Sequence, residues 1–278
     1  MTDDETAQEV RLTGLQRAEF AKAARLLTWI SVVQILIGVL AGLGPYVAND
    51  FLAYCLAIAS LAMVVAWAFL SFEHRRSRDC AERARRSSLL IEGLGLRLTP
   101  SERLERECLF TVSAREGQKH ENHAYYASTS SPGPERLIEM LEETAFWSSR
   151  LMIRSRRVLT VACVLLGLAS VAAVLGVLPV VSPERLTFVR ALAAAFSVVV
   201  VADLVGSTVA FSVGADRLRH IITRLESLRP RSTLSAELVA VLCEYNSTVE
   251  STPMFLPRVY ESYREEINLL WNTRRGAR

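Results

Sequence analysis

The sequence predicts an all-α integral membrane protein, in which four transmembrane helices form two hairpins that extend into a cytoplasmic helical bundle. Hydrophobic residues make up 51% of the chain and gather into four blocks, whereas the charged residues gather between them. Each block is long enough to cross a bilayer as a helix. Basic residues flank the blocks mainly on one side of the expected membrane. This asymmetry determines the predicted topology.

The chain is predicted to begin with a cytoplasmic amino-terminal tail, residues 1–25, followed by the first transmembrane hairpin, residues 26–70. The tail is polar, and only its later part has the apolar spacing of an amphipathic helix. The hairpin consists of the uncharged stretches Leu26–Leu43 and Phe51–Leu70. The second of these helices is expected to continue out of the membrane to about Gly93, because glycine favours a helix end.

A cytoplasmic helical segment, residues 71–157, is predicted between the two hairpins. A helix is expected to start at Thr99-Pro100, since proline is tolerated in the first turn, and to end near Gly117. A polar loop follows. The next helix is expected to start at Glu135 and to continue without a break into the third apolar block.

The second transmembrane hairpin is predicted over residues 158–213, and cytoplasmic helices over residues 214–278. Arg229-Pro230 is expected to end the helix that leaves the fourth block. A further helix is expected over Leu234–Val249, and Pro257 is expected to open the last one. By the positive-inside rule, both termini and the middle segment face the cytoplasm of a multi-pass protein in the bacterial inner membrane.

Composition and motifs argue against several classes of function. A formal net charge of +3 is too small to predict nucleic acid as a partner. The five cysteines lack the spacing of a metal site and are interpreted as reduced structural thiols. His120 and His123 would share a metal only in a helix with further ligands, and Ser128–Ser131 is typical of a turn. We therefore expect no enzyme, no catalytic residue, no cofactor and no bound metal.

Polar residues inside the apolar blocks are candidates for a pore or gate. They are Asp203, Gln34, Ser60 and Ser170. A carboxylate at the centre of a membrane helix costs about 2.5–3.5 kcal/mol on insertion scales, so Asp203 should face the bundle, a cavity or another subunit. The alternative is an aspartate that holds helices together through a hydrogen bond, for example with Gln34. The sequence leaves both interpretations open.

Small residues at intervals of four mark candidate faces for close helix packing. They are Gly38, Gly42, Ala202, Gly206, Ala210 and Gly214. Such a stripe serves either packing within one chain or self-association, which would make the protein a homo-oligomer.

A further group of residues is a candidate for contact with a ligand or with lipid. It consists of Arg75, Arg76, Arg78, Arg83, Arg85, Arg86, Tyr125 and Tyr126. The arginines suit a phosphorylated ligand, or anionic lipid head groups beside the membrane. The tyrosines suit stacking on a base, or burial in the helical bundle.

Two stretches resemble the SMODS-associating four-transmembrane effector family, which occurs in bacterial anti-phage defence. The first contains Tyr125-Tyr126, Pro134-Glu-Arg-Leu and Glu142-Glu-Thr-Ala-Phe-Trp147 before the third block. The second contains Glu244-Tyr-Asn246, Pro253-Met-Phe-Leu-Pro257, Val259-Tyr260 and Glu266-Ile-Asn-Leu-Leu-Trp271. The resemblance implies a membrane effector that forms pores when a nucleotide second-messenger system detects phage, ending in abortive infection.

The leading hypothesis is therefore a non-enzymatic effector that oligomerises in the lipid bilayer and opens a pore or disrupts the membrane when triggered from the cytoplasm. The trigger would be a cyclic nucleotide or a signalling partner protein. The alternative is a membrane-anchored interaction module with inert spans. A small transporter is a third reading, which the lack of interrupted helices and paired charges in the spans disfavours.

Overall fold

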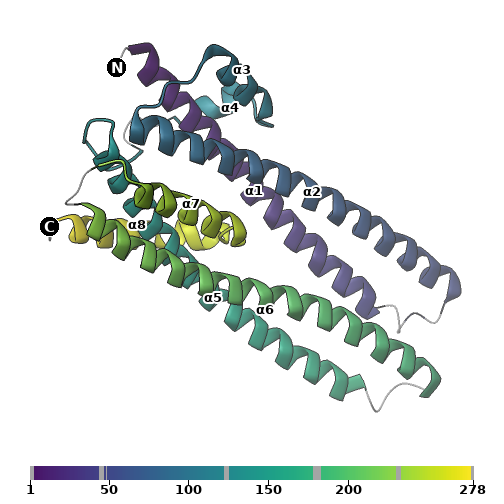
Figure 1. The fold of residues 1–278 in the computed structure, drawn as a ribbon. Coiled ribbons are helices and arrows are strands. Elements are labelled where there is room, and N and C mark those ends of the chain that lie inside the picture. Colours follow the sequence, from purple (N-terminus) through teal and green to yellow (C-terminus); the bar gives the residue numbers. More distant parts are fainter. Residues whose placement is uncertain are drawn as a thin grey trace.

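The computed structural model describes residues 3–43, 47, 49–121, 125–177, 183–229 and 233–276, and these residues contain helices and no strand. The prediction of an all-α protein is thus confirmed for the described part of the chain. Its helices are α1 (Asp3–Leu43), α2 (Asp50–Leu94), α3 (Pro100–Leu109), α4 (Ala114–Gln118), α5 (Pro134–Val177), α6 (Pro183–Leu228), α7 (Ala236–Ser251) and α8 (Pro257–Gly276) (Figure 1).

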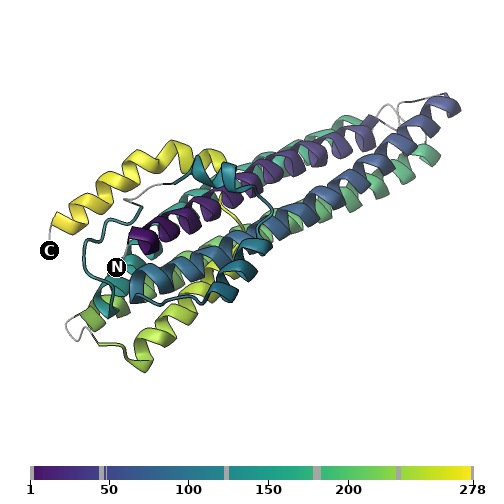
Figure 2. The ribbon, with the colours of Figure 1, turned by 90° about the horizontal axis from the view of Figure 1, so that it is seen from above.

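The four long helices form two hairpins. α1 packs along α2 in hairpin 1, and α5 packs along α6 in hairpin 2. Figures 1 and 2 show that the hairpins extend in the same direction, with hairpin 1 lying over hairpin 2. The shorter helices gather around the end of the hairpins that holds both termini. We call this the polar end, comprising residues 71–94 of α2, 134–157 of α5 and 214–228 of α6, and the opposite end the apolar end.

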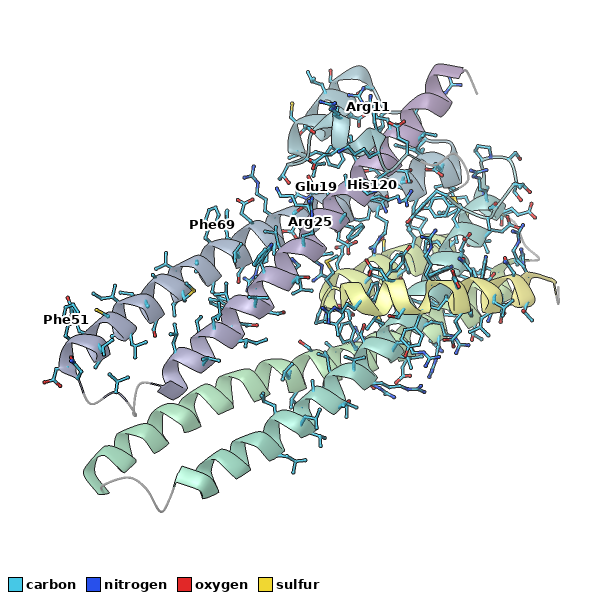
Figure 3. The ribbon with its side chains drawn as sticks, turned by 180° about the vertical axis from the view of Figure 1, so that it is seen from behind. Arg11, Glu19, Arg25, Phe51, Phe69 and His120 are labelled. Atoms are coloured by element: carbon cyan, nitrogen blue, oxygen red, sulfur yellow. The ribbon has the colours of Figure 1, made fainter. Side chains whose placement is uncertain are left out.

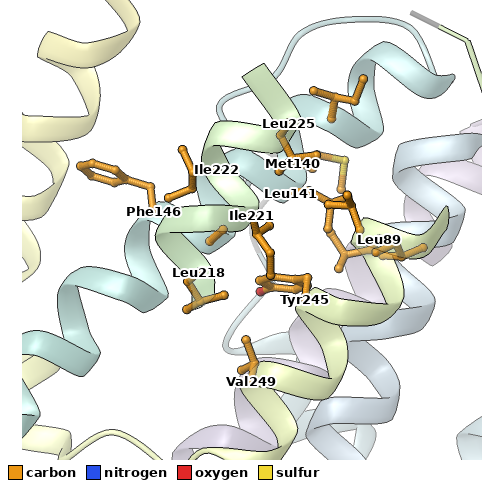
Figure 4. Packing of buried hydrophobic residues seen from close by; sticks show 14 of the residues in the cluster. Leu89, Met140, Leu141, Phe146, Leu218, Ile221, Ile222, Leu225, Tyr245 and Val249 are labelled. Atoms are coloured by element: carbon orange, nitrogen blue, oxygen red, sulfur yellow. The ribbon is translucent and has the colours of Figure 1, made fainter. Parts of the chain in front are cut away.

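The hydrophobic core lies at the polar end. It combines buried side chains from α2, α5, α6, α7 and α8 (Figure 4). Leu141, Ile221 and Tyr245 come from three different helices and are all buried there. Burial of each large apolar side chain contributes about 1.5–3 kcal/mol, so these contacts fix how the helices sit on each other.

The apolar end has a different character, because its large side chains are uncovered. Residues Val10–Leu40 of α1 and helix α2 are long and apolar enough to cross a membrane, and the most apolar part of α2 has no buried residue. Phe51 and Phe69 are 74% and 65% exposed and point away from the molecule (Figure 3). α5 and α6 also run as continuous helices from the polar end into the third and fourth apolar blocks.

Several predicted helix ends are confirmed. α2 continues past the apolar block to Leu94, where Gly95 takes a left-handed conformation with φ of 71° and its N–H bonds the carbonyls of Leu90 and Ile91. Glycine adopts this conformation without the steric cost of a side chain. α6 ends just before Arg229-Pro230, and α8 begins at Pro257, both as expected.

The amino-terminal segment is more ordered than a polar tail. α1 begins at Asp3 and continues unbroken into the first apolar block. Leu15, Ala18 and Ala23 are buried, and α1 contacts α4 as well as α2 along this stretch. Residues 10–25 of α1 therefore belong to the packed polar end.

The prediction of one helix from Pro100 to about Gly117 is wrong. The start is as expected, because Thr99 and Glu102 form a reciprocal capping pair, with the Thr99 N–H donating to the Glu102 carboxylate at 2.8 Å. The chain then leaves the helix after Leu109 and starts α4 at Ala114.

A carboxylate on α1 explains this break. Glu19 is fully buried and faces the segment between α3 and α4 (Figure 3). It accepts hydrogen bonds from the backbone N–H of Thr111 and, at 3.0 Å, of Val112. A helix through these residues would use the same N–H groups, so the two arrangements exclude each other.

Candidate functional site

The candidate site is the junction between the two hairpins at the polar end. It consists of the polar half of α2, the carboxyl end of α7, the loop around Tyr126 and the start of α5. Arg78 of α2 reaches the last turn of α7, where it donates hydrogen bonds to the carbonyls of Val249 at 3.3 Å, Glu250 at 3.1 Å and Thr252. A cation at this end of a helix also meets the negative pole of the helix dipole. Burial lowers the pKa of Arg78, opposed by the nearby Glu82 carboxylate.

Two further arginines of α2 belong to the same junction. Arg86 pairs with Glu250 of α7, with 3.0 Å between Nε and Oε1. Arg85 is buried and pairs with Glu82 one turn earlier, with 2.8 Å between NH2 and Oε2. The Arg85 guanidinium also lies over the ring of Tyr245, 5.2 Å from its centre. α2 thus presents three cations to α7 along one face.

The carboxylate of Glu82 is buried with its partner. Burial raises the pKa of Glu82, and the neighbouring Arg85 and Arg78 oppose that shift. A buried pair of this kind contributes little net stability, but removal of one partner leaves an uncompensated charge. The pair therefore makes the position of α2 beside α7 sensitive to any change in either group.

Tyr126 fills the space between these helices from the loop before α5. Its side chain is buried, and its ring meets the ring of Tyr125 edge to face with centroids 4.7 Å apart. Burial raises the pKa of Tyr126 well above its usual value. The Arg17 guanidinium of α1 lies over the Tyr125 ring at 5.8 Å. The tyrosine pair therefore ties the loop to hairpin 1.

The carboxylate of Glu92 lies between the two helices of hairpin 1. Glu92 of α2 accepts hydrogen bonds from Thr13 of α1 and from Ser88, both at 2.9 Å. Burial raises the pKa of Glu92, and the two hydroxyl groups oppose this shift. The group therefore links α1 to α2.

The hairpins touch most closely where α2 ends and α5 begins. A Cβ on Gly93 would lie 2.9 Å from Cδ1 and 3.3 Å from Cα of Leu137, so this position tolerates no side chain without movement. The carbonyl of Gly93 accepts a hydrogen bond from the N–H of Gly133 at 2.7 Å. The predicted helix-ending glycine is therefore also the contact point between the two hairpins.

The arginine block predicted as a ligand or lipid contact divides into two groups. Arg78, Arg85 and Arg86 pair with groups of the protein itself. Arg75, Arg76 and Arg83 are exposed. Tyr126 is buried as the second interpretation predicted, and Tyr125 remains partly exposed.

Of the four polar residues predicted to line a pore or gate, the structure describes the side chains of Gln34 and Ser60. Gln34 is half-buried in α1. The Ser60 hydroxyl donates a hydrogen bond of 2.8 Å to the carbonyl of Leu56 in its own helix, which satisfies it without a partner across the bundle. The side chains of Asp203 and Ser170 lie outside the described residues.

The small residues predicted for close helix packing have different surroundings. A Cβ on Gly214 would meet Thr252 Oγ1 at 2.7 Å and Met152 Sδ at 2.9 Å, so Gly214 serves packing within the chain. A Cβ on Gly206 would have no neighbour within 4 Å among the residues that the structure describes. Gly38 and Ala210 are half-buried. The surroundings of Ala202 and Gly42 lie outside the described part.

The cysteines, serines and histidines singled out in the sequence show no sign of a catalytic or metal site in the described part of the chain. All five cysteines are free. Ser128 and Ser130 donate hydrogen bonds to Glu139 at 2.6 and 3.0 Å, as expected for a turn rather than a nucleophile. The backbone carbonyl of His120 accepts a hydrogen bond from Arg17, and His123 lies outside the described residues. Among the described side chains, no group of three His, Cys, Asp or Glu is placed to hold a metal.

Sequence reasoning missed the buried Glu19 and the half-buried Glu92 of hairpin 1, and it missed the role of the α7 end. Leu15 and Ala23, one turn before and one turn after Glu19, are apolar and buried, which was the available indication for Glu19. The carboxyl end of α7 carries no sequence motif for binding an arginine. No protein-family model matches the chain, and no curated protein or solved structure matches it either.

Proposed function

We propose that the protein is a multi-pass protein of the bacterial inner membrane, with four transmembrane helices and both termini in the cytoplasm, that acts as a pore-forming effector. The observation that carries this proposal is the division of α2 into a charged, packed half and an apolar, uncovered half within one unbroken helix. A rearrangement at the junction therefore acts directly on the apolar half.

The membrane assignment is supported by the exposure of the apolar end. Soluble monomers rarely leave a continuous apolar patch of more than a few hundred Å² uncovered. α2 alone exposes a series of large apolar side chains over its first 23 residues, namely Phe51, Leu52, Tyr54, Ile58, Leu61, Val64, Val65, Trp67, Phe69 and Phe72. A bilayer covers such a surface at no cost. The third block, residues 158–181, carries no charge, and the fourth, residues 188–213, carries only Arg190 and Asp203, so the same argument extends to the third and fourth spans.

The proposal of an oligomer is supported by how little the spans of one chain bury against each other. In the described residues, the apolar stretches of α2 and α5 contain no buried side chain. Four helices of one chain enclose little beyond their own side chains, so a wide pore requires several copies. Gly206, with open space around it, offers one position where a helix of another copy can approach closely.

The role in anti-phage defence is supported by the resemblance of the two stretches described from the sequence. The junction gives this role a physical route, because α7 and α8 follow hairpin 2 in the chain while Arg78 and Arg86 connect α7 to hairpin 1. A nucleotide or a partner protein that displaces α7 would release α2 from it. The spans of several copies would then rearrange into a pore.

Membrane potential in living cells tests this proposal. Cells express the wild type, or Asp203→Asn, together with the matched defence operon, which is then activated. We expect the wild type to depolarise the membrane on activation. Loss of depolarisation in Asp203→Asn, at equal membrane insertion, would place Asp203 in the conducting path, and unchanged depolarisation would assign it to packing. Full potential in activated wild-type cells would refute the pore.

The alternative of an anchored interaction module predicts a different result. If the spans are inert, replacing the two hairpins' apolar halves with unrelated transmembrane helices leaves protection against phage intact. A pore-forming effector loses protection in the same experiment. The replacement therefore separates the two functions even where the trigger is unidentified.

A further inference from the structure

A pocket of about 240 Å³ lies at the polar end between α5, α6 and α8. It is away from the junction described above, on the side of hairpin 2 that α8 covers. Figure 4 shows Phe146 of α5 and Ile222 of α6 at this position, with Phe146 pointing toward α8. The Phe146 ring lies 5.4 Å from the ring of Trp271 of α8.

The charged groups of the pocket are three arginines, one from each helix, and one glutamate. They are Arg150, Arg219, Arg274 and Glu226. Arg274 is already held by carboxylates, at 2.6 Å from Glu226 and 3.1 Å from the buried Glu142. The other two lining arginines, Arg150 and Arg219, are not held by these two carboxylates.

These two arginines are weakly engaged by the protein. The Arg150 guanidinium lies over the Phe146 ring at 5.2 Å and forms no ion pair among the described residues. Arg219 pairs with Asp216 one turn earlier at 3.2 Å, and both side chains are more than half exposed. An exposed pair of this kind is worth about 0–1 kcal/mol, so a better anion displaces Asp216 readily.

We propose that this pocket binds a phosphate group through Arg150 and Arg219. Guanidinium groups bind phosphate oxygens in a bidentate manner, and arginines on two helices can approach one phosphate from two sides. Thr223 also lines the pocket, and its hydroxyl donates a hydrogen bond of 3.2 Å to the carbonyl of Arg219. The volume is below the range of about 300–1,000 Å³ typical of sites for larger organic ligands, which favours a single phosphate group.

The position of the pocket defines two sources for that phosphate. Arg150 precedes the third apolar block by about 12 Å along α5, and Arg219 follows the fourth by about 9 Å along α6. The pocket therefore lies close to the surface of the proposed membrane. The phosphate belongs either to a lipid head group or to a soluble phosphorylated compound, and the same two arginines would bind it. The inference concerns binding and does not depend on pore formation.

Binding is measured on the purified full-length protein in lipid nanodiscs, by the melting temperature Tm during titration with inorganic phosphate against sodium chloride of equal ionic strength. A ligand that binds the folded state raises Tm in proportion to its occupancy. The variants are Arg150→Gln and Arg219→Gln, and Arg217→Gln is the matched control, because Arg217 is exposed on the same helix and does not line the pocket. Circular dichroism and the Tm without phosphate confirm that each variant folds.

We expect phosphate to raise the Tm of the wild type and of Arg217→Gln. In each pocket variant, the apparent Kd for phosphate should be at least about tenfold weaker, which corresponds to the loss of one charge-assisted hydrogen bond. Nanodiscs of phosphatidylcholine with and without phosphatidic acid distinguish the sources. If phosphatidic acid raises Tm through the same arginines and removes the response to added phosphate, the ligand is a lipid head group. If it leaves the phosphate response unchanged, the ligand is soluble. An absence of any arginine-dependent shift in both membranes overturns the proposal.

Discussion

Replacement of Arg78 by methionine tests the junction most directly. Methionine keeps the length of the aliphatic stem and removes the charge and the donors. One guanidinium nitrogen of Arg78 serves three carbonyls at the end of α7. A hydrogen bond to a charged group contributes about 1.5–3 kcal/mol, and the helix dipole about 0.3–1 kcal/mol. Because the three carbonyls share one donor group, we expect a total loss of about 2–4 kcal/mol.

The free energy of unfolding in detergent micelles measures this loss, and limited proteolysis measures where it acts. The stretch 252–256, which links α7 to α8, should become cleavable in Arg78→Met while hairpin 1 remains intact. Arg83→Met is the control, since Arg83 is an exposed neighbour on α2, and its effect should stay within about 0.5 kcal/mol. If both variants have the same stability and the same cleavage pattern, Arg78 does not hold α7 and the account of the junction is wrong.

Three further predictions concern the other contacts at the polar end. Gly93→Ala should destabilise the fold by about 1–2 kcal/mol, because overpacking against Leu137 exceeds the gain in helix propensity, whereas Gly206→Ala, with no neighbour within 4 Å, should be neutral or stabilising in the same unfolding assay. Burial raises the pKa of Glu92, so its contribution to stability is present at low pH and is lost as pH rises through its folded-state pKa. Glu92→Gln should therefore increase stability at alkaline pH and lose this advantage toward acidic pH, and a pH-independent effect in the unfolding curves would contradict the assignment. Glu19→Ala should cost about 3 kcal/mol and speed amide hydrogen exchange over residues 110–113, and unchanged exchange there would disprove the proposed cause of the break between α3 and α4.

Most helix positions follow from local chemistry and were predicted from the sequence. Helix ends are marked by the glycine near residue 95, by Pro257 and by Arg229-Pro230. The backbone preferences of glycine and proline are local and do not depend on distant residues. The apolar blocks likewise predict the two long candidates for membrane helices through their length alone.

The features that the sequence did not reveal share one physical cause, which is a contact between residues far apart in the chain. Glu19 interrupts a helix some 90 positions later by taking its backbone N–H groups, and no local pattern around Thr111 predicts that. Arg78, grouped with its arginine neighbours as a candidate contact for lipid or ligand, binds a helix end about 170 positions later, which no local pattern predicts. The sequence gives the charge of each side chain, but the partner of that charge depends on how the whole chain packs.

The close approach of Gly93 to Leu137 has a mechanical consequence, because it can act as a pivot. From this point, α2 extends back to Asp50 without a break, a distance of about 65 Å at the rise of an α-helix. A tilt of only about 5° around the pivot would move the far end of that lever by about 6 Å, more than the radius of the helix backbone. A small rotation of α2 at the polar end would thus become a displacement at the apolar end that is large enough to separate neighbouring helices.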